Sequence, residues 1–343
     1  MYKINFQKPI HIHFIGIGGI SMSGLAEILL EEGFTVSGSD AKESPLTKKL
    51  ESEGAVIHYG QCAENITDDI NCVVYTAAIN KSNPELMEAV GKKIPMLTRA
   101  ELLGQLMKNY DTPIAVSGTH GKTTTTSMIS EVLLAADMDP TISVGGILKT
   151  IGGNIRVGKS GNFITEACEY TNSFLHFYPK ISVILNIEED HLDFFKDLED
   201  IRHSFHQFSA LLPSDGTLII NGDIKDYQEI YEGLDCNVIT YGSSAEFDYS
   251  ATEIQYDEKG FVSFELLKHN TSCGRVQLSV TGDHNVSNAL AAIATAELLG
   301  IPMDTIRKGL LSFSGTDRRF EYKGTFNGVT VVDDYAHHPT EIR

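Results

Sequence analysis

Two glycine-rich segments carry the residues with the clearest chemistry. One of them reads Gly118-Thr119-His120-Gly121-Lys122-Thr123-Thr124-Thr125, and it follows the apolar run 114–117 and opens a helical pattern. Backbone amides of such a loop bind phosphates, its lysine reaches the β- and γ-phosphates, and the threonine after the lysine is a Mg2+ ligand. Two residues separate the glycines, where the general phosphate-loop pattern has four. The strand–loop–helix context and the G-K-T-T run still predict a phosphate site here, which we call the second glycine loop (residues 118–121).

Two residues further along the chain are candidate metal ligands. Glu166 ends an apolar run at 163–166, and His191 follows another run at 182–186. Both positions fall at the carboxyl ends of predicted strands, the edge at which parallel sheets bind ligands. With Thr123 they predict a Mg2+ site beside a triphosphate, although either residue taken alone reads as a surface group.

The other segment, Gly16-Ile17-Gly18-Gly19-Ile20-Ser21-Met22-Ser23-Gly24, also lies between a predicted strand and a predicted helix. Glycines there let the backbone approach a phosphate, and the helix N-terminus adds partial positive charge. We call residues 16–19 the first glycine loop. A dinucleotide fingerprint would place glycine at position 21, where this chain has Ser21, while Asp40 ends the next strand and suits a ribose. A nicotinamide dinucleotide and a ligand-free tight turn both remain open alternatives.

These segments need β-sheets to position them, and the sequence predicts two such sheets. Residues 10–110 alternate between short apolar runs and helical patterns, and a second α/β rhythm begins after the polar stretch 109–113. Residues 247–280 alternate in the manner of antiparallel hairpins. The predicted fold is α/β, with an N-terminal Rossmann-like parallel-sheet domain and then a phosphate-loop ATPase domain that carries an added antiparallel β portion.

Composition narrows the class of protein. The 343 residues carry 27 Lys plus Arg against 46 Asp plus Glu, a net charge of −19, which disfavours nucleic-acid partners and anionic membranes. No run reaches the length of a membrane span, and the first nine residues lack the apolar core of a signal peptide. The five cysteines are scattered, without a C-x-x-C pair. We therefore expect a cytoplasmic protein with reduced thiols.

Read in order, the motifs resemble those of the Mur ligases, the ATP-dependent ligases that build the peptide of peptidoglycan. The resemblance covers the whole chain. It rests on both glycine segments and on Ser39-Asp40, Glu188 to Asp193, Gly282 to Ala292, Arg318-Arg319-Phe320 and Asp333 to Pro339. It implies a UDP-substrate domain at 1–108, a central ATP-binding domain at 109–319, and the start of a third domain at 320–343.

The resemblance also implies roles for individual residues. The UDP substrate would be bound by Gly16, Gly18, Gly19, Ile20, Ser21, Met22, Ser23, Asp40, Thr76, Ala77 and Arg99. ATP would be bound by Gly118, Thr119, Gly121, Lys122, Thr123, Thr124, His284, Asn285, Asn288 and Asp334. Lys122, His120, Arg318 and Arg319 would be catalytic, Thr123, Glu166 and His191 would hold metal, and Tyr335 and His337 would face the amino acid. Without the resemblance, His284 to Asn288 reads as an ordinary capped helix start.

The implied reaction joins L-alanine to the carboxylate of UDP-N-acetylmuramate through an acyl phosphate, with ATP and Mg2+ as cofactors. It belongs to peptidoglycan synthesis, and thus to cell-wall biogenesis, cell shape and cell division. Because most of the third domain would be absent, we expect binding more than turnover. The alternatives are a ligase that recycles a tripeptide onto UDP-muramate, a folylpolyglutamate-type ligase, a nicotinamide-dependent oxidoreductase, and a non-catalytic nucleotide-binding fragment.

Overall fold

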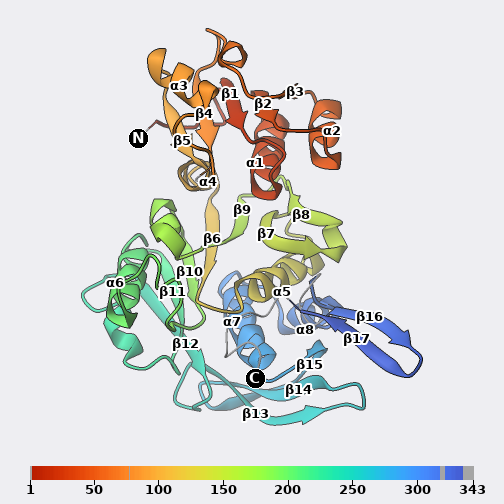
Figure 1. Cartoon of the computed structure of the whole chain (residues 1–343). Helices are drawn as coiled ribbons and strands as arrows, with labels where there is room; N and C mark the ends of the chain where they lie inside the picture. Colours follow the sequence, from red (N-terminus) through yellow and green to blue (C-terminus); the bar gives the residue numbers. More distant parts are fainter. Residues whose placement is uncertain (1, 77, 317–320, 335–343) are drawn as a thin grey trace. The chain divides into compact units, whose positions relative to one another are not determined.

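A computed structural model describes residues 2–76, 78–316 and 321–334 of the chain. These residues form two compact units (Figure 1). The first unit contains the described chain up to Tyr110 together with His176–Tyr178. The second contains the described chain from Asp111 onward, without that short segment.

The first unit is built on a five-stranded parallel sheet with the order β3-β2-β1-β4-β5. Its strands are β1 (His11–Ile15), β2 (Thr35–Asp40), β3 (Val56–Tyr59), β4 (Cys72–Tyr75) and β5 (Met96–Thr98). Its helices are α1 (Ile20–Glu31), η1 (Ala63–Asn65), α2 (Pro45–Ser52), α3 (Pro84–Gly91) and α4 (Arg99–Met107). The strand order reverses between β1 and β4, and open α/β sheets bind ligands at such a reversal, outside the carboxyl ends of the strands.

Local sequence explains where the helices of this unit begin. Ser44 caps α2 by accepting a hydrogen bond from the Thr47 amide, with proline at the first helical position, as the sequence predicts. Asn83 caps α3 in the same way, again ahead of a proline. Thr98 and Glu101 form a reciprocal capping box at the start of α4.

The second unit contains a ten-stranded mixed sheet with the order β15-β14-β13-β12-β11-β10-β6-β9-β7-β8. Its strands are β6 (Thr112–Ser117), β7 (Thr141–Leu148), β8 (Gly153–Arg156), β9 (Asn162–Glu166), β10 (Ile181–Ile184), β11 (Thr217–Asn221), β12 (Asn237–Gly242), β13 (Tyr249–Tyr256), β14 (Phe261–Lys268) and β15 (Thr271–Thr281). Strands from β12 to β7 are parallel, whereas β14 pairs antiparallel with both β13 and β15. A separate antiparallel hairpin joins β16 (Glu321–Phe326) and β17 (Val329–Asp333).

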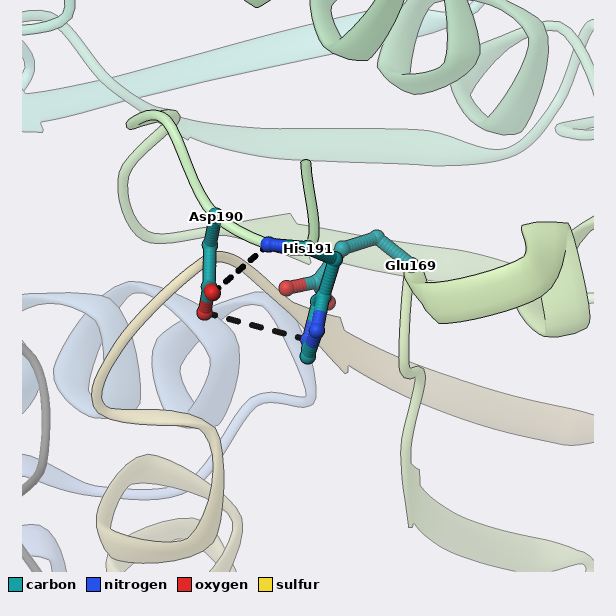
Figure 2. Close-up of side chains that lie close together, drawn as sticks. All are labelled: Glu169, Asp190 and His191. Carbon is teal, nitrogen blue, oxygen red and sulfur yellow. Dashed lines mark hydrogen bonds and ion pairs between the residues drawn. The ribbon is translucent and has the colours of Figure 1, made fainter. Parts of the chain in front are cut away.

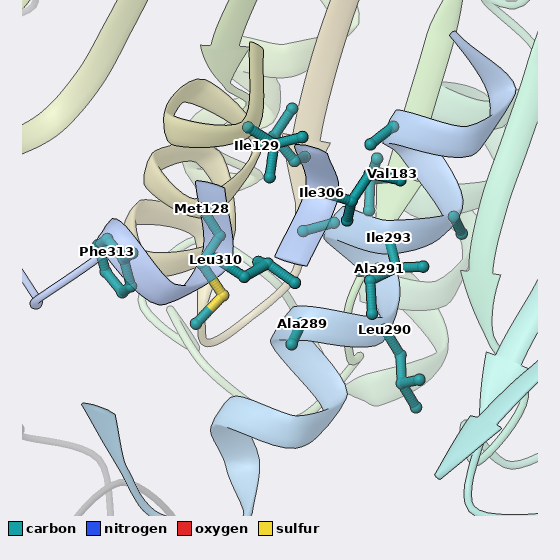
Figure 3. Packing of buried hydrophobic residues seen from close by; sticks show 14 of the residues in the cluster. Met128, Ile129, Val183, Ala289, Leu290, Ala291, Ile293, Ile306, Leu310 and Phe313 are labelled. Carbon is teal, nitrogen blue, oxygen red and sulfur yellow. The ribbon is translucent and has the colours of Figure 1, made fainter. Parts of the chain in front are cut away.

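Helices α5 (Lys122–Ala135), α7 (His284–Leu298) and α8 (Met303–Ser312) pack together against this sheet. Their shared core includes Met128 and Ile129 of α5, Ala289 to Ile293 of α7, and Leu310 of α8 (Figure 3). The remaining helical segments are α6 (Leu198–Ser209), η2 (Lys149–Ile151), η3 (Tyr170–His176) and η4 (Tyr227–Ile230). Because α5 carries the second glycine loop at its N-terminus, this core fixes the direction in which that loop faces.

The observed folds confirm the predicted class, an α/β chain with a parallel first sheet and an antiparallel portion added to the second. In the second sheet, β6 has β9 on one side and β10 on the other. The second glycine loop follows β6, Glu166 is the last residue of β9, and His191 lies in the segment after β10. Neighbouring parallel strands therefore bring the three predicted phosphate and metal segments to one edge of the sheet.

Candidate functional site

The first glycine loop is held by the residues that end β2. The backbone amides of Gly16 and Ile17 both donate to the Ser39 carbonyl, at 2.8 and 2.9 Å. The Gly18 amide donates to Asp40 Oδ2 at 2.8 Å. A Cβ on Gly18 would lie 2.8 Å from that same carboxylate oxygen, so only glycine fits without displacing Asp40. Three successive loop amides thus turn inward and define the loop's shape.

The N-terminus of α1 is left open by this arrangement. Gly19 is the N-cap, no side chain caps the helix, and its first turn contains no acidic residue. Gly19, Ile20 and Ser21 are exposed, whereas Met22 and Ser23 are buried and Ser23 Oγ donates to the Ile20 carbonyl. A helix of twelve residues whose N-terminus is not capped by a side chain suits a phosphate group. The buried Met22 can therefore offer such a ligand its backbone but not its side chain, whereas the Ser23 amide already donates to the Gly19 carbonyl at 2.8 Å.

The other residues predicted for the UDP substrate lie around β4 and β5. Thr76 follows β4, is half-buried, and accepts a hydrogen bond from the Ala78 amide at 3.2 Å. Arg99 is the first residue of α4 and is also half-buried. The strands that precede them are neighbours in the sheet, so both residues lie at the edge that carries the first glycine loop. Ala77 lies outside the described residues.

The second glycine loop depends on both of its glycines. Gly118 has a φ of +144° and Gly121 a φ of +80°, conformations that favour glycine. A Cβ on Gly121 would lie 2.6 Å from Asn288 Oδ1, and one on Gly118 would lie 2.9 Å from Leu185 Cβ. The loop is therefore enclosed by α7 on one side and by the segment after β10 on the other.

Asn186 holds the middle of this loop in place. Its Oδ1 accepts from the His120 amide at 2.7 Å, and its Nδ2 donates to the His120 carbonyl at 3.1 Å. Its own carbonyl accepts from the Thr119 amide. The His120 ring lies 3.4 Å from the Glu188 carboxylate. Asn186 is not among the predicted site residues, because an asparagine at a strand end has no distinctive spacing and its partner is 66 residues away.

Lys122, the expected phosphate ligand, is folded back onto its own loop. Its Nζ donates to the Gly118 and Thr119 carbonyls and lies 3.1 Å from the Glu169 carboxylate. The Glu169 side chain is almost fully buried and that of Lys122 is only 16% exposed. A buried carboxylate is tolerated when a cation and hydrogen bonds compensate it, which Lys122 does here. Lys122 can transfer from these oxygens to those of a bound phosphate without losing hydrogen-bond partners.

Thr123 and Glu166 form the pair that the sequence predicts as metal ligands. Thr123 Oγ1 donates to Glu166 Oε2 at 3.1 Å, and the other carboxylate oxygen accepts from the Gly145 amide at 2.5 Å. Both residues lie at the edge where β6 and β9 end. A hydroxyl and a carboxylate are hard oxygen donors, which suit Mg2+.

His191 belongs to a second group of metal-binding side chains. Glu169, Asp190 and His191 each offer one ligand atom, and these atoms lie within 4.8 Å of one another (Figure 2). Asp190 Oδ1 accepts from the His191 amide at 2.7 Å, which shapes the turn in which His191 adopts a φ of +52°. The Tyr170 ring packs on the imidazole with centroids 4.4 Å apart. Two carboxylates and one imidazole fit a divalent cation, and Glu169 and Asp190 were not among the predicted ligands.

The residues predicted around adenine lie at the start of α7. Asn288 is buried beside Gly121 and donates from Nδ2 to Asn285 Oδ1 at 3.0 Å, while Asn285 donates to the Thr281 carbonyl at 2.7 Å. Asp283 occupies the N-cap position of α7, but its side chain makes no capping hydrogen bond. Asn288 is brought to the second glycine loop, with His284 at the start of the same helix.

Except for Thr124, the remaining predicted residues lie late in the chain. Asp334 follows β17 and is exposed. The structure does not describe Arg318, Arg319, Tyr335 and His337. Thr124 lies in the first turn of α5 and is half-buried. Among the helices that the structure describes, none is both long enough and apolar enough to cross a membrane.

The geometry therefore presents two glycine-rich loops in separate units, each at the N-terminus of a helix, and one of them has acidic side chains that suit cations. Comparison with known families decides what this combination means. Residues 116–296 match the Mur ligase middle domain, and residues 11–111 match the Mur ligase family catalytic domain. The chain belongs to the Mur ligase family.

Relatives of this Mur ligase include the UDP-N-acetylmuramate–L-alanine ligase of Agathobacter rectalis, which is 64% identical over 343 residues. That match covers 100% of this chain and 75% of the relative. The protein of the same name from Lachnospira eligens is 62% identical, again over 100% of this chain and 75% of the relative. These matches confirm the resemblance inferred from the motifs.

Solved structures of Mur ligases agree with the fold. The UDP-N-acetylmuramate–alanine ligase of Thermotoga maritima superposes with a TM-score of 0.82 at 30% identity, covering 97% of this chain and 76% of that one. The UDP-N-acetylmuramate:L-alanyl-γ-D-glutamyl-meso-diaminopimelate ligase of Neisseria meningitides gives a TM-score of 0.81 at 31% identity. It covers 91% of this chain and 100% of that one.

Proposed function

We propose that this Mur ligase joins L-alanine to the carboxylate of UDP-N-acetylmuramate with hydrolysis of ATP to ADP and phosphate, a step of peptidoglycan synthesis. One observation carries the choice of substrates, the 64% identity along the whole chain to a protein of that name. The geometry agrees with it, since one unit has an open helix N-terminus for a diphosphate and the other has a lysine-bearing loop for a triphosphate.

In the proposed reaction, a muramate carboxylate oxygen attacks the γ-phosphorus of ATP and the bond to the β-phosphate oxygen breaks, giving an acyl phosphate and ADP. The alanine nitrogen then attacks the acyl carbon, the carbon–oxygen bond to phosphate breaks, and the nitrogen loses a proton. The first step brings an anion to a polyanion, so positive charge must be placed beforehand. We assign this task to Lys122, which already lies against the loop that would bind the phosphates.

The other side chains of the site would position the second glycine loop, bind metal ions or bind the UDP substrate. Asn186 would keep His120 and the backbone of the second glycine loop rigid while the γ-phosphate of ATP is transferred. Thr123 and Glu166 would hold one Mg2+, and Glu169, Asp190 and His191 would hold a second. When bound, such ions neutralise phosphate charge. The open N-terminus of α1 would bind the UDP diphosphate, and Asp40 would lie near the uridine.

The test is product formation from ATP, MgCl2, UDP-N-acetylmuramate and L-alanine, followed by mass spectrometry after prolonged incubation so that slow turnover is also detected. We expect ADP release that requires both other substrates and a product heavier by one alanyl residue. ADP release that needs neither UDP-N-acetylmuramate nor L-alanine and gives no alanylated product would contradict the proposal.

A second candidate is supported by the structure from Neisseria meningitides, whose name specifies a ligase for a muramyl tripeptide. Replacing L-alanine by L-alanyl-γ-D-glutamyl-meso-diaminopimelate in the same assay separates the two. Product from the tripeptide but not from L-alanine would favour this candidate.

A further inference from the structure

Glu85 is a buried carboxylate that lies beneath the first glycine loop without belonging to it. It is in the first turn of α3, and its side chain has no exposed surface. Leaving a carboxylate in this position costs several kcal/mol unless its oxygens are hydrogen-bonded or paired with a cation. Its partners should therefore show which part of the unit needs this charge.

Three partners from three different elements surround the Glu85 carboxylate. Ser39 Oγ donates to Oε2 at 2.5 Å, and Asn65 Nδ2 donates to Oε1 at 2.5 Å. His13 Nε2, on β1, lies 3.8 Å from Oε2. Burial alone would raise the pKa of the Glu85 carboxyl, but these hydrogen bonds outweigh burial and hold the pKa below its ordinary value.

His13 is itself fully buried, and its other ring nitrogen is used. Nδ1 lies 2.9 Å from Ser37 Oγ, and that hydroxyl lies 2.8 Å from His11 Nε2. His13 Nε2 has no described group within hydrogen-bond distance, and its charged neighbour is Glu85. A bare nitrogen lone pair facing a carboxylate would be repelled, so we assign the N–H to this nitrogen, which faces Glu85 across 3.8 Å without forming a hydrogen bond.

One partner of Glu85, Ser39, also holds the first glycine loop, together with the next residue, Asp40. The Ser39 carbonyl accepts the Gly16 and Ile17 amides, and the Asp40 carboxylate accepts the Gly18 amide. Asn65 adds a second route to Asp40, because Asn65 Nδ2 donates to the Gly60 carbonyl and the Gly60 amide donates to the Asp40 carbonyl. The carboxylate thus fixes the Ser39-Asp40 dipeptide from both sides.

We propose that Glu85 is a positioning residue of the UDP-N-acetylmuramate site, whose buried carboxylate holds Ser39 and Asp40, and through them the first glycine loop, in the conformation that binds the diphosphate. This inference rests on the proposed function. We place Glu85 out of contact with the ligand, because its side chain has no exposed surface and its two oxygens accept from Ser39 and Asn65. Removal of the Glu85 carboxylate frees Ser39 and Asp40 to move. The first glycine loop, which precedes α1, then loses the fixed conformation that we propose for diphosphate binding.

The experiment measures Kd for UDP-N-acetylmuramate and, separately, for ATP with Mg2+, by calorimetry on wild type, Glu85→Gln and Ser39→Ala. Glu85→Gln keeps the side-chain shape and removes the charge, whereas Ser39→Ala removes the hydroxyl that joins Glu85 to the loop carbonyl. We expect Kd for the UDP-sugar to rise about tenfold or more in both variants, and Kd for ATP to stay within about twofold.

Glu88→Gln is the matched control, because Glu88 lies one turn further along α3 and forms an exposed pair with Lys92. It should leave both dissociation constants unchanged. Thermal unfolding reports stability separately, and Ser39→Ala decides the matter if Glu85→Gln does not fold. Kd for the UDP-sugar within twofold of wild type in the folded variants would overturn the inference. Failure of wild type itself to bind the UDP-sugar would instead contradict the proposed function.

Discussion

The two glycine loops solve one problem, phosphate binding at a helix N-terminus, with different surroundings. The first glycine loop has no lysine, and three of its amides are consumed by Ser39 and Asp40. The second has Lys122 and lies beside Glu166 and Glu169. A loop without a cation suits a diphosphate that is only held, whereas a loop with a lysine and paired carboxylates suits a phosphate whose charge changes during a reaction.

The carboxylates beside the two loops also differ in what they bind. Asp40 and Glu85 accept hydrogen bonds from backbone and side chains of their own unit, which makes them parts of a rigid frame. Glu169 instead shares its carboxylate between Lys122 and the group formed with Asp190 and His191. The comparison suggests that the first site is preorganised and that the second exchanges partners when nucleotide and metal bind.

Lys122→Ala should have the largest effect, and it tests whether the second glycine loop differs from the first in carrying out the reaction. It removes the cation that we place at the transferred phosphate, so formation of ADP and product should fall about a thousandfold or more, below detection in most assays. Kd for UDP-N-acetylmuramate should remain within about twofold, since Lys122 and the first glycine loop belong to different units. Turnover retained within about tenfold would contradict the assigned role.

Replacing the oxygen ligands of the second loop should have a smaller effect. Thr123→Ala or Glu166→Gln removes one hard donor, and we expect the Mg2+ concentration needed for half-maximal activity to rise about tenfold to a hundredfold. Titration of activity against MgCl2, together with direct Mn2+ binding measured by electron paramagnetic resonance, checks this. An unchanged Mn2+ affinity would remove Thr123 and Glu166 from the metal site.

Gly18→Ala tests the first glycine loop in the same way. Its Cβ would meet Asp40 Oδ2 at 2.8 Å, so the contact between the Gly18 amide and Asp40 must open. We expect Kd for UDP-N-acetylmuramate to rise about tenfold while Kd for ATP stays unchanged. Gly91→Ala is the matched control, because nothing lies within 4 Å of its Cβ position. Equal affinities in the two variants would show that this loop does not bind the UDP-sugar.

Tyr170 should give the smallest effect. Its ring packs on His191, and its hydroxyl donates to Asp193 Oδ2 at 2.8 Å. Tyr170→Phe keeps the ring, so Mn2+ affinity should stay within about twofold, whereas Tyr170→Ala should weaken it about threefold to tenfold by freeing the imidazole. Equal affinities in the two variants would show that ring packing does not orient His191.

Local patterns predicted most of the elements that position the loops. Residues 10–110 form the alternating strands and helices that their pattern predicts, and Ser44 caps a helix that has proline at its first position. The hairpin of β7 and β8 was missed, because glycines at 145 and 146 interrupt the strand signal. One of these glycines brings its amide to Glu166, so the irregularity has a place in the site.

The composition of the site was harder to predict than its location. Lys122, Thr123 and Glu166 are recognisable from spacing and from the strand–loop–helix context. The pairing of Lys122 with Glu169, 47 residues away, depends on tertiary structure. The same holds for the hydrogen bonds between the Asn186 side chain and the His120 backbone. Sequence periodicity does not encode contacts of this kind, and the roles assigned to the individual site residues stay predictions.

The most direct test of the central claim, that the first glycine loop binds a UDP-sugar and the second binds ATP, is a calorimetric titration of this chain. UDP-N-acetylmuramate, NADH, and ATP with Mg2+ are titrated separately into wild type, Gly18→Ala and Lys122→Ala. We predict one-to-one binding of the UDP-sugar that Gly18→Ala weakens and Lys122→Ala does not, with NADH silent. Binding of NADH in place of the UDP-sugar, or loss of UDP-sugar binding in Lys122→Ala, would contradict it.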